Sequence, residues 1–353
     1  MEKGVNKVMA DTKKQHYVPQ CYLRHFASTE ERINLFDKEK MEVRTNQNIL
    51  NVAMKNRFYD LNLFDMYKKA ESAEQEKIKK ELGKLLGTDN IEAALNDIDS
   101  QQYIEKKFFS ENVESIYSFM LENIIKKSNN GNQWIIQNCY ALSKSEKEIF
   151  SLFVAIQIIR TKSFRDTIGA TFEKLIETMT YKSQMIEEGA LPKEAFEVAV
   201  DKEYVKLQHN GMVLDPEMAL EFAKVLVKHI WVIYVNKTNT PFYTSDDPVV
   251  NIPHKHDEFL SYGGLNSEEI EILFPISSNL LLGMYHADTY KDIFSDRKYM
   301  PVNDQEWVKY FNIAQVVHSQ RVVFSISDNF DLAENICREN PDIQIFKPRV
   351  EVL

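Results

Sequence analysis

Cysteine is scarce in this sequence, and its spacing is not that of a metal site. The three cysteines, Cys21, Cys139 and Cys337, are scattered over 353 residues without a CxxC pair. This scatter argues against a disulfide framework and against a zinc site built from cysteine. We therefore expect the protein to work in a reducing compartment, the cytoplasm.

Long apolar runs are also missing. The opening residues, MEKGVNKVMADTKKQ, are polar and charged and lack the apolar core of a signal peptide. No later run approaches the roughly 20 consecutive apolar residues that a membrane span needs. The sequence predicts neither secretion nor membrane insertion.

Positive charge is in deficit. The chain has 43 Lys and Arg against 53 Asp and Glu, which gives a net charge of -10. A field of this sign repels nucleic acids and anionic membranes. Nucleic acid or a nucleotide would need a local basic patch as its binding site, and a protein partner is the alternative.

Familiar catalytic motifs do not occur. The sequence has no Walker A loop, dinucleotide-binding glycine pattern, HExxH, GxSxG or kinase set. The common ATPase, Rossmann, zincin and serine-hydrolase classes therefore lose most of their support.

The residues that are present predict one large α+β domain over 1–353, because 44% of them are hydrophobic and no linker divides the chain. Apolar spacing of i, i+3, i+4 predicts a central helical bundle, and in 101–127 it predicts a buried stripe of Ile104, Phe108, Ile116, Met120 and Ile124. β-Branched and aromatic runs in the C-terminal third predict a mixed or antiparallel sheet, which an N-terminal hairpin joins because an isolated hairpin is marginally stable. The expected sub-regions are an extended segment with the hairpin (14–60), the bundle (61–228), a strand-rich region (229–328) and a C-terminal helix and tail (329–353).

Residues 15–26, QHYVPQCYLRHF, are similar to the opening signature of a largely bacterial domain-of-unknown-function family, the one numbered 4238. Further features follow in the order that this family shows: Arg57-Phe58-Tyr59, an acidic helix around Glu111 and Glu114, Gln157 with Arg160-Thr161, Ser245-Asp246-Asp247-Pro248, Phe274-Pro275-Ile276-Ser277, and Asn312 before Arg321. The resemblance covers about Lys14 to Ser327. The family usually has a bulky aromatic or apolar residue where this chain has Cys21. No activity is implied by the resemblance.

Two motifs carry the strongest functional candidates. His16 and Tyr17 lie in a segment that Pro19 holds extended, and a histidine there is a candidate general base, metal ligand or phosphate contact. The structural alternative is a histidine that pins the N-terminal segment through backbone hydrogen bonds. Gln157 and Arg160 share one helix face, where Arg160 has two candidate partners. One is a phosphate, and the other is an internal carboxylate from Glu111, Glu114 or Asp246.

Asp246 and Asp247 follow a strand candidate, and carboxylates at a strand end are candidate metal ligands. Neighbouring side chains on extended backbone point in opposite directions, so we expect one of the two to face a given site. The alternative, which the neighbouring Ser245 and Pro248 favour, is a turn stabilised by side-chain bonds to the backbone.

These candidates lead to two hypotheses. In the first, the protein is a nuclease-like or other phosphoesterase enzyme, with a role in bacterial defence. His16, Tyr17, Gln157 and Arg160 are then catalytic, Asp246 and Glu114 hold Mg²⁺ or Mn²⁺, and Arg24, Asp247 and Asn312 are further motif residues. It requires that these side chains converge and that Asp246 does not cap a turn. In the second, the protein is a non-catalytic sensor or interaction module, and the same residues form a sealed structural network.

Overall fold

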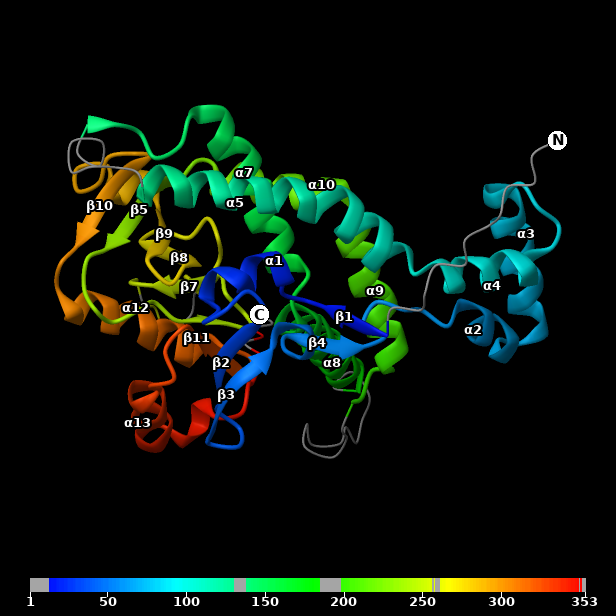
Figure 1. Cartoon of the computed structure of the whole chain (residues 1–353). Helices are drawn as coiled ribbons and strands as arrows, with labels where there is room; N and C mark the ends of the chain where they lie inside the picture. Colours follow the sequence, from blue (N-terminus) through cyan, green and yellow to red (C-terminus); the bar gives the residue numbers. More distant parts are fainter. Residues whose placement is uncertain are drawn as a thin grey trace, which may run out of the picture.

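The computed structural model describes residues 13–129, 138–184, 198–255, 257, 261–348 and 350. Helices and β-sheets pack together in the body, and a smaller group of helices extends from one side (Figure 1). The α+β class predicted from the sequence is confirmed. Within the described residues, the search for a helix of membrane-spanning length and hydropathy finds none.

The N-terminal segment is part of the core. Pro19 breaks the extended chain, and the residues after it fold into two short helices whose Tyr22, Leu23 and Phe26 are completely buried. A two-stranded antiparallel sheet then closes the segment on itself. Its elements are β1 (Lys14–His16), α1 (Gln20–Leu23), η1 (Arg24–Phe26), β2 (Arg32–Asp37), β3 (Glu42–Asn48), η2 (Ile49–Asn51) and β4 (Met54–Asn56).

A small helical lobe follows. It has a core of its own made by Tyr67, Ile91 and Leu95, and it extends away from the sheets in Figure 1. The lobe consists of α2 (Leu63–Lys69), α3 (Ser72–Leu86) and α4 (Ile91–Gln101).

The next helix begins as a π-helix, η3 (Ile104–Val113), and continues as α5 (Glu114–Asn129). A π-helix bonds residue i to i+5, which shifts the buried face relative to a 3.6-residue repeat. The stripe predicted from that repeat is therefore wrong at Ile116, which is 53% exposed. Phe109, Val113 and Tyr117 take the buried positions instead.

Four further helices of the described residues belong to the bundle. Ser143 and Glu146 form a capping box at the start of the first, and the last packs closely against it. Thr161 accepts from the backbone N–H of Phe164 at 3.2 Å, so it caps the second helix directly after Arg160 ends the first. The helices are α7 (Lys144–Ile159), α8 (Lys162–Gln184), α9 (Lys202–Leu214) and α10 (Pro216–Leu226).

The larger sheet is mixed and comes from the C-terminal third. Its order is β10-β5-β9-β8-β7, with β10 parallel to β5 and every other pair antiparallel. The three central strands are buried over their whole length, as expected for runs rich in β-branched and aromatic residues. The strands are β5 (Ile230–Asn236), β7 (Val250–Pro253), β8 (Ile270–Ser277), β9 (Leu280–Tyr285) and β10 (Lys298–Val302).

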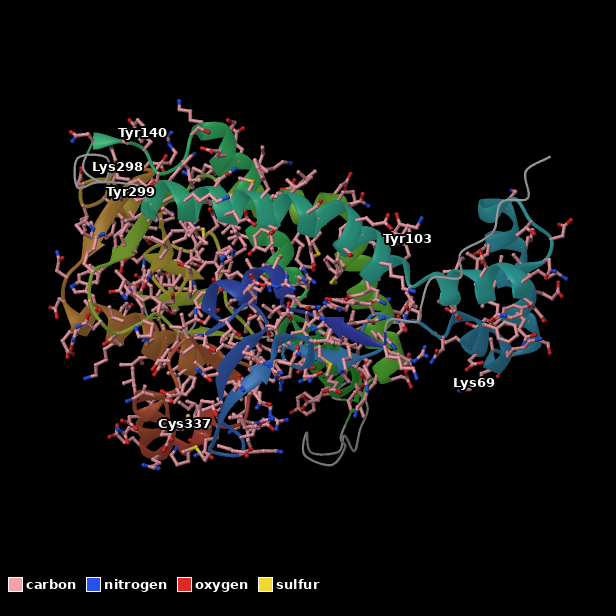
Figure 2. All side chains as sticks on the ribbon, viewed as in Figure 1. Lys69, Tyr103, Tyr140, Lys298, Tyr299 and Cys337 are labelled. Atoms are coloured by element: carbon pink, nitrogen blue, oxygen red, sulfur yellow. The ribbon has the colours of Figure 1, made fainter. Side chains whose placement is uncertain are left out.

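One end of this sheet is tied to the helices by side chains. The Lys298 ammonium lies 4.3 Å from the centre of the Tyr140 ring, and the two backbones form an isolated antiparallel bridge. Both residues are labelled at this edge in Figure 2. The chain before α7 is thereby anchored to β10.

The smaller sheet joins the two ends of the chain in the order β3-β2-β11-β6. β11 (Val322–Ser325) pairs with β2 on one side and with β6 (Thr244–Ser245) on the other. The predicted joining of the N-terminal hairpin to strands of the C-terminal third is confirmed. The remaining helices are α11 (Ala287–Tyr290), α12 (Gln305–His318), α13 (Asp331–Glu339) and η5 (Pro341–Ile343).

Candidate functional site

Four of the predicted site residues meet in one buried network. Arg160, at the end of α7, donates from Nη2 to the His16 carbonyl oxygen at 2.7 Å and to Glu114 Oε1 at 3.0 Å. Gln157, one turn earlier, donates to the Tyr17 carbonyl oxygen at 3.3 Å. Of the partners proposed for Arg160, the structure therefore selects the Glu114 carboxylate.

Glu105 belongs to the same network, although no pattern in the sequence singles it out. Its Oε1 accepts from the His16 backbone N–H at 3.4 Å, and it extends from the π-helix that also carries Phe109. The Arg160 guanidinium stacks on the Phe109 ring at 3.8 Å. The π-helix thus supplies both a carboxylate and a flat apolar surface to this network.

The network is closed to solvent at its centre. His16 is 3% exposed and Arg160 2% exposed, and each directs hydrogen bonds to the protein itself. Four buried polar atoms, namely His16 Nε2, Glu105 Oε2, Gln157 Oε1 and Arg160 Nε, lack a hydrogen-bond partner among the described atoms. The interior here is therefore strongly polar while remaining out of reach of a large substrate.

Burial controls the charges of this network. It lowers the pKa of His16 to about 4, although the Glu114 carboxylate acts in the opposite direction. Burial raises the pKa of Glu105 to about 7, against the attraction of Arg160. Burial is the largest effect on Arg160 and opposes its charge, but Glu114, Tyr59 and Glu105 together outweigh burial and raise the Arg160 pKa. At neutral pH the network therefore holds a neutral histidine and a charged arginine.

Tyr17 points away from His16. Its ring packs against Phe58 with centroids 5.4 Å apart, and burial together with the Asp246 carboxylate raises the pKa of its phenol. Arg24 lies at the surface, where it pairs with Glu31 at 3.4 Å. Neither side chain is among the hydrogen-bond partners of the Arg160 network.

Asp246 stabilises a strand. Its carboxylate is 1% exposed and accepts the backbone N–H groups of Gln320, Arg321 and Val322 at 2.9 to 3.1 Å. Asn312 plays a similar part, since it accepts from the Tyr243 N–H at 2.7 Å and donates to the Pro241 carbonyl at 3.0 Å. Asn312 therefore holds the segment before β6, and Asp246 holds the segment that leads into β11.

The proposed metal pair does not form. Glu114 is bound to Arg160, while Asp246 is occupied by three backbone N–H groups in a different part of the fold. Over the described residues, no three His, Cys, Asp or Glu side chains are grouped so that they could hold a metal ion. The arrangement does not fit the Mg²⁺ or Mn²⁺ centre expected from the sequence.

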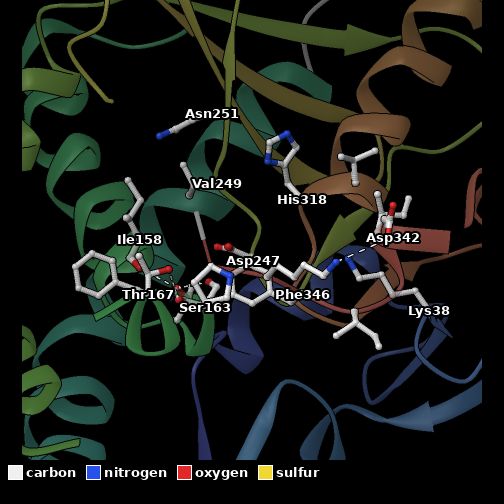
Figure 3. A pocket seen from close by; sticks show the side chains of 17 residues that line it. Lys38, Ile158, Ser163, Thr167, Asp247, Val249, Asn251, His318, Asp342 and Phe346 are labelled. Carbon is white, nitrogen blue, oxygen red and sulfur yellow. Dashed lines mark hydrogen bonds and ion pairs between the residues drawn. The ribbon is translucent and has the colours of Figure 1, made fainter. Parts of the chain in front are cut away.

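Asp247 instead lines an open cleft of about 460 Å³ (Figure 3). Thr161 and Ser163 at the start of α8 form one side, and Lys38 from the β2–β3 turn forms another. Apolar walls come from Ile158, Phe164, Val249 and Val317, and further polar groups from Thr167, Asn251 and His318. The sequence did not single out this cleft, because its residues come from five separate segments.

The cleft carboxylate titrates near neutrality. Burial raises the pKa of Asp247 to about 7, with a further rise from the Asp246 carboxylate, although a hydrogen bond with Ser163 acts in the opposite direction. Lys38 faces both carboxylates and donates from Nζ to the Ser319 carbonyl. The two neighbouring aspartates thus have different roles, since Asp246 is structural and Asp247 faces the cleft.

Comparison with known proteins agrees with the arrangement of motifs. A family model described as "Protein of unknown function (DUF4238)" matches residues 14–329. The chain belongs to the DUF4238 family. The resemblance found in the sequence is confirmed, and every DUF4238 motif named above lies inside the matched range. No curated protein and no solved structure matches this DUF4238 chain.

Proposed function

We propose that this protein is a non-catalytic sensor or interaction module. Its motif residues form the internal framework, and the cleft beside Asp247 receives the ligand. One observation carries the proposal: His16, Arg160 and Asp246 are each at most 3% exposed and bond to groups of the protein itself. Buried groups that bond to the protein itself are typical of a structural network, although His16 Nε2 and Arg160 Nε have no hydrogen-bond partner among the described atoms.

The enzyme hypothesis required that the candidate side chains converge and that Asp246 does not cap a turn. His16, Gln157 and Arg160 do meet, but His16 and Arg160 are buried, and a catalytic group has to reach the substrate. The hypothesis also required a free Asp246, and this carboxylate caps the backbone at the start of β11. The motif residues therefore hold β1 and β11 in place.

The cleft has the character of a ligand site. Its volume of about 460 Å³ lies within the range of about 300–1,000 Å³ that is usual for small-molecule and cofactor pockets. Apolar walls surround a few polar groups that face one another, Asp247, Ser163 and Lys38 among them. A ligand that fills this space meets both the framework helices α7 and α8 and the strand region around β7.

A fragment screen tests this proposal. Ligand-observed NMR would be run on wild type, on Val249→Trp, which fills the cleft, and on Ile293→Trp, a matched substitution at an exposed position. We expect fragments that bind wild type and Ile293→Trp but not Val249→Trp. The absence of hits, or hits that Val249→Trp retains, would contradict the proposal.

A hydrolysis assay tests the part of the proposal that says the protein is non-catalytic. Wild type would be incubated with bis(4-nitrophenyl) phosphate and with an oligonucleotide, each with Mg²⁺ or Mn²⁺. We expect no turnover. Turnover by wild type that a folded His16→Ala variant lacks would contradict the module proposal and support the enzyme hypothesis.

A nuclease-like or other phosphoesterase enzyme is the second candidate, and Asp247 is the observation that favours it. Its carboxyl lies in an open cleft with a pKa of about 7, close to the value that suits general acid–base catalysis at neutral pH. Asp247→Asn would then abolish turnover of the phosphodiester while leaving the fold intact. Unchanged turnover in that variant would remove this candidate.

We place the module in the bacterial cytoplasm. Cys21, Cys139 and Cys337 are all free thiols, and two of them are partly exposed. Exposed free thiols persist in reducing compartments, whereas secreted proteins usually pair them.

A further inference from the structure

The outer wall of the Asp247 cleft is formed by the C-terminal segment 341–348, which follows α13. This segment lines the cleft with side chains that include Ile343, Phe346 and Lys347. Figure 3 shows Phe346 among the side chains that line the cleft, together with Asp247, Ile158 and Val249. The chain therefore places one of its own aromatic rings at the candidate ligand site.

The family match covers one wall of the cleft and not the other. Thr161 and Asp247 on the inner wall belong to family motifs within residues 14–329. The C-terminal segment 341–348 lies beyond that match. The inner wall is thus part of the family domain, whereas the outer wall is supplied by residues outside it.

Two of the contacts that hold the C-terminal segment 341–348 come from residues close to it in the sequence. Gln344 Nε2 donates to the Cys337 carbonyl oxygen at 2.9 Å, and Lys347 Nζ lies 3.7 Å from Asp342 Oδ1. Ile345 is 65% exposed and lies at the surface, whereas Ile343 packs against the core cluster that contains Phe36 and Cys337. Surface segments with few buried contacts open at a small free-energy cost.

The chemistry of the two walls is complementary. The inner wall is apolar at Ile158, Phe164 and Val249, and Phe346 and Ile343 line the same cleft. Ile343 also packs against the core cluster that contains Phe36 and Cys337. The adjacent Asp246 and Asp247 carboxylates both interact with the ammonium of Lys38. A further cation next to an apolar side chain suits this wall, and Lys347 follows Phe346 directly.

We infer that the C-terminal segment 341–348 is an internal ligand of the cleft, and that the external partner is an extended peptide of the same chemistry. Such a peptide carries two apolar side chains three residues apart, the second aromatic and followed by lysine, as in Ile343, Phe346 and Lys347. The inference rests on the proposed function, in which the cleft is the ligand site. A tethered segment acts at a high effective concentration, so an external peptide has to displace it.

Peptide binding to the full-length chain tests the inference. The probe is a fluorescein-labelled peptide with the sequence of residues 341–348, PDIQIFKP, titrated by fluorescence anisotropy. Its control peptide carries serine at the positions of Ile343 and Phe346. The proteins are wild type, the double variant Ile343→Ser/Phe346→Ser, which loosens the internal segment, and that double variant with Val249→Trp added.

We expect the double variant to bind the probe at least about tenfold more tightly than wild type, because the internal competitor is weakened. Val249→Trp should remove this binding, and the control peptide should not bind. Equal binding to wild type and the double variant, binding that survives Val249→Trp, or no binding at all would overturn the inference.

Hydrogen exchange of wild type supplies a second measurement that does not depend on the variants folding. An excess of unlabelled peptide should speed exchange of the backbone amides in 343–347, and unchanged exchange contradicts the displacement. If fragments still bind wild type but not Val249→Trp, a failed peptide experiment removes this inference alone. If both experiments fail, the proposed function fails with it.

Discussion

Arg160 Nη2 and the carbonyl oxygen of His16 lie 2.7 Å apart, although 144 residues separate them in the sequence. The same nitrogen also contacts Glu114 Oε1, so one guanidinium connects β1, the start of α5 and the end of α7. A charged donor bonded to a buried carbonyl is a strong contact when all of its partners are in place. The N-terminal motif is therefore held by the bundle and is not displayed for a substrate.

The raised pKa of Glu105 predicts how the stability of the protein depends on pH. Burial raises its folded-state pKa to about 7, above the ordinary value of 4.5. Between these values the unfolded chain has already lost the proton that the folded chain retains, so the Glu105 contribution to stability falls as pH rises. Glu105→Gln removes this loss. We expect the variant to gain about 1–3 kcal/mol relative to wild type between pH 4.5 and 7.

Urea unfolding of wild type and Glu105→Gln at several pH values between 4.5 and 8 measures this gain. His16 acts with the opposite sign in both proteins, because its lowered pKa of about 4 makes its contribution rise with pH up to about 6.5. The comparison of the two proteins cancels that effect. A difference in unfolding free energy that stays constant over this range would contradict the assignment.

Asp246 and Asp247 are neighbours that we expect to behave differently. Asp246→Ala leaves three buried backbone N–H groups without their acceptor, at a cost of about 3 kcal/mol or more. Asp247→Ala removes a carboxylate that faces the cleft and should change stability by less than about 1 kcal/mol. Thermal and urea unfolding of the two variants provide the comparison. Equal losses would mean that both aspartates are structural.

Gly283 in β9 and Gly211 in α9 offer a matched pair of substitutions that tests the packing of the larger sheet. A Cβ on Gly283 would lie 2.8 Å from ring atoms of Tyr234 and Tyr285, whose hydroxyls are hydrogen-bonded at 2.6 Å. We expect Gly283→Ala to cost about 1–3 kcal/mol through overpacking. Gly211→Ala in α9 meets no atom within 4 Å and should stabilise by about 0.4–1 kcal/mol. Two variants of equal stability in urea would contradict this description of the core.

Patterns that depend on local spacing could be read from the sequence. The strands of the larger sheet follow from local composition, because runs of β-branched and aromatic residues favour extended backbone. Gln157 and Arg160 were placed on one face because of their spacing, and Glu114 was among the partners named for Arg160. Asp246 and Asp247 have different hydrogen-bond partners, since one accepts from the backbone of Gln320 and the other bonds to Ser163.

Long-range partners could not be read in this way. The groups that Asp246 binds lie 74 to 76 residues later, and the five segments that form the cleft are brought together only by tertiary packing. Glu105 was missed because a charged residue in a helical stretch is usually exposed. Its burial follows from the π-helix, whose five-residue bonding breaks the repeat used to predict the buried face.

The most direct test of the central claim is the unfolding free energy of Arg160→Met, with hydrogen exchange over residues 14–26. Losing the guanidinium leaves the Glu114 carboxylate and the His16 carbonyl without their partner, so we expect a loss of about 3–5 kcal/mol and faster exchange in that segment. Arg24→Met, at the surface, should change stability by less than about 0.5 kcal/mol. Wild-type stability and exchange in Arg160→Met would contradict a structural network and indicate that Arg160 serves a ligand or substrate instead.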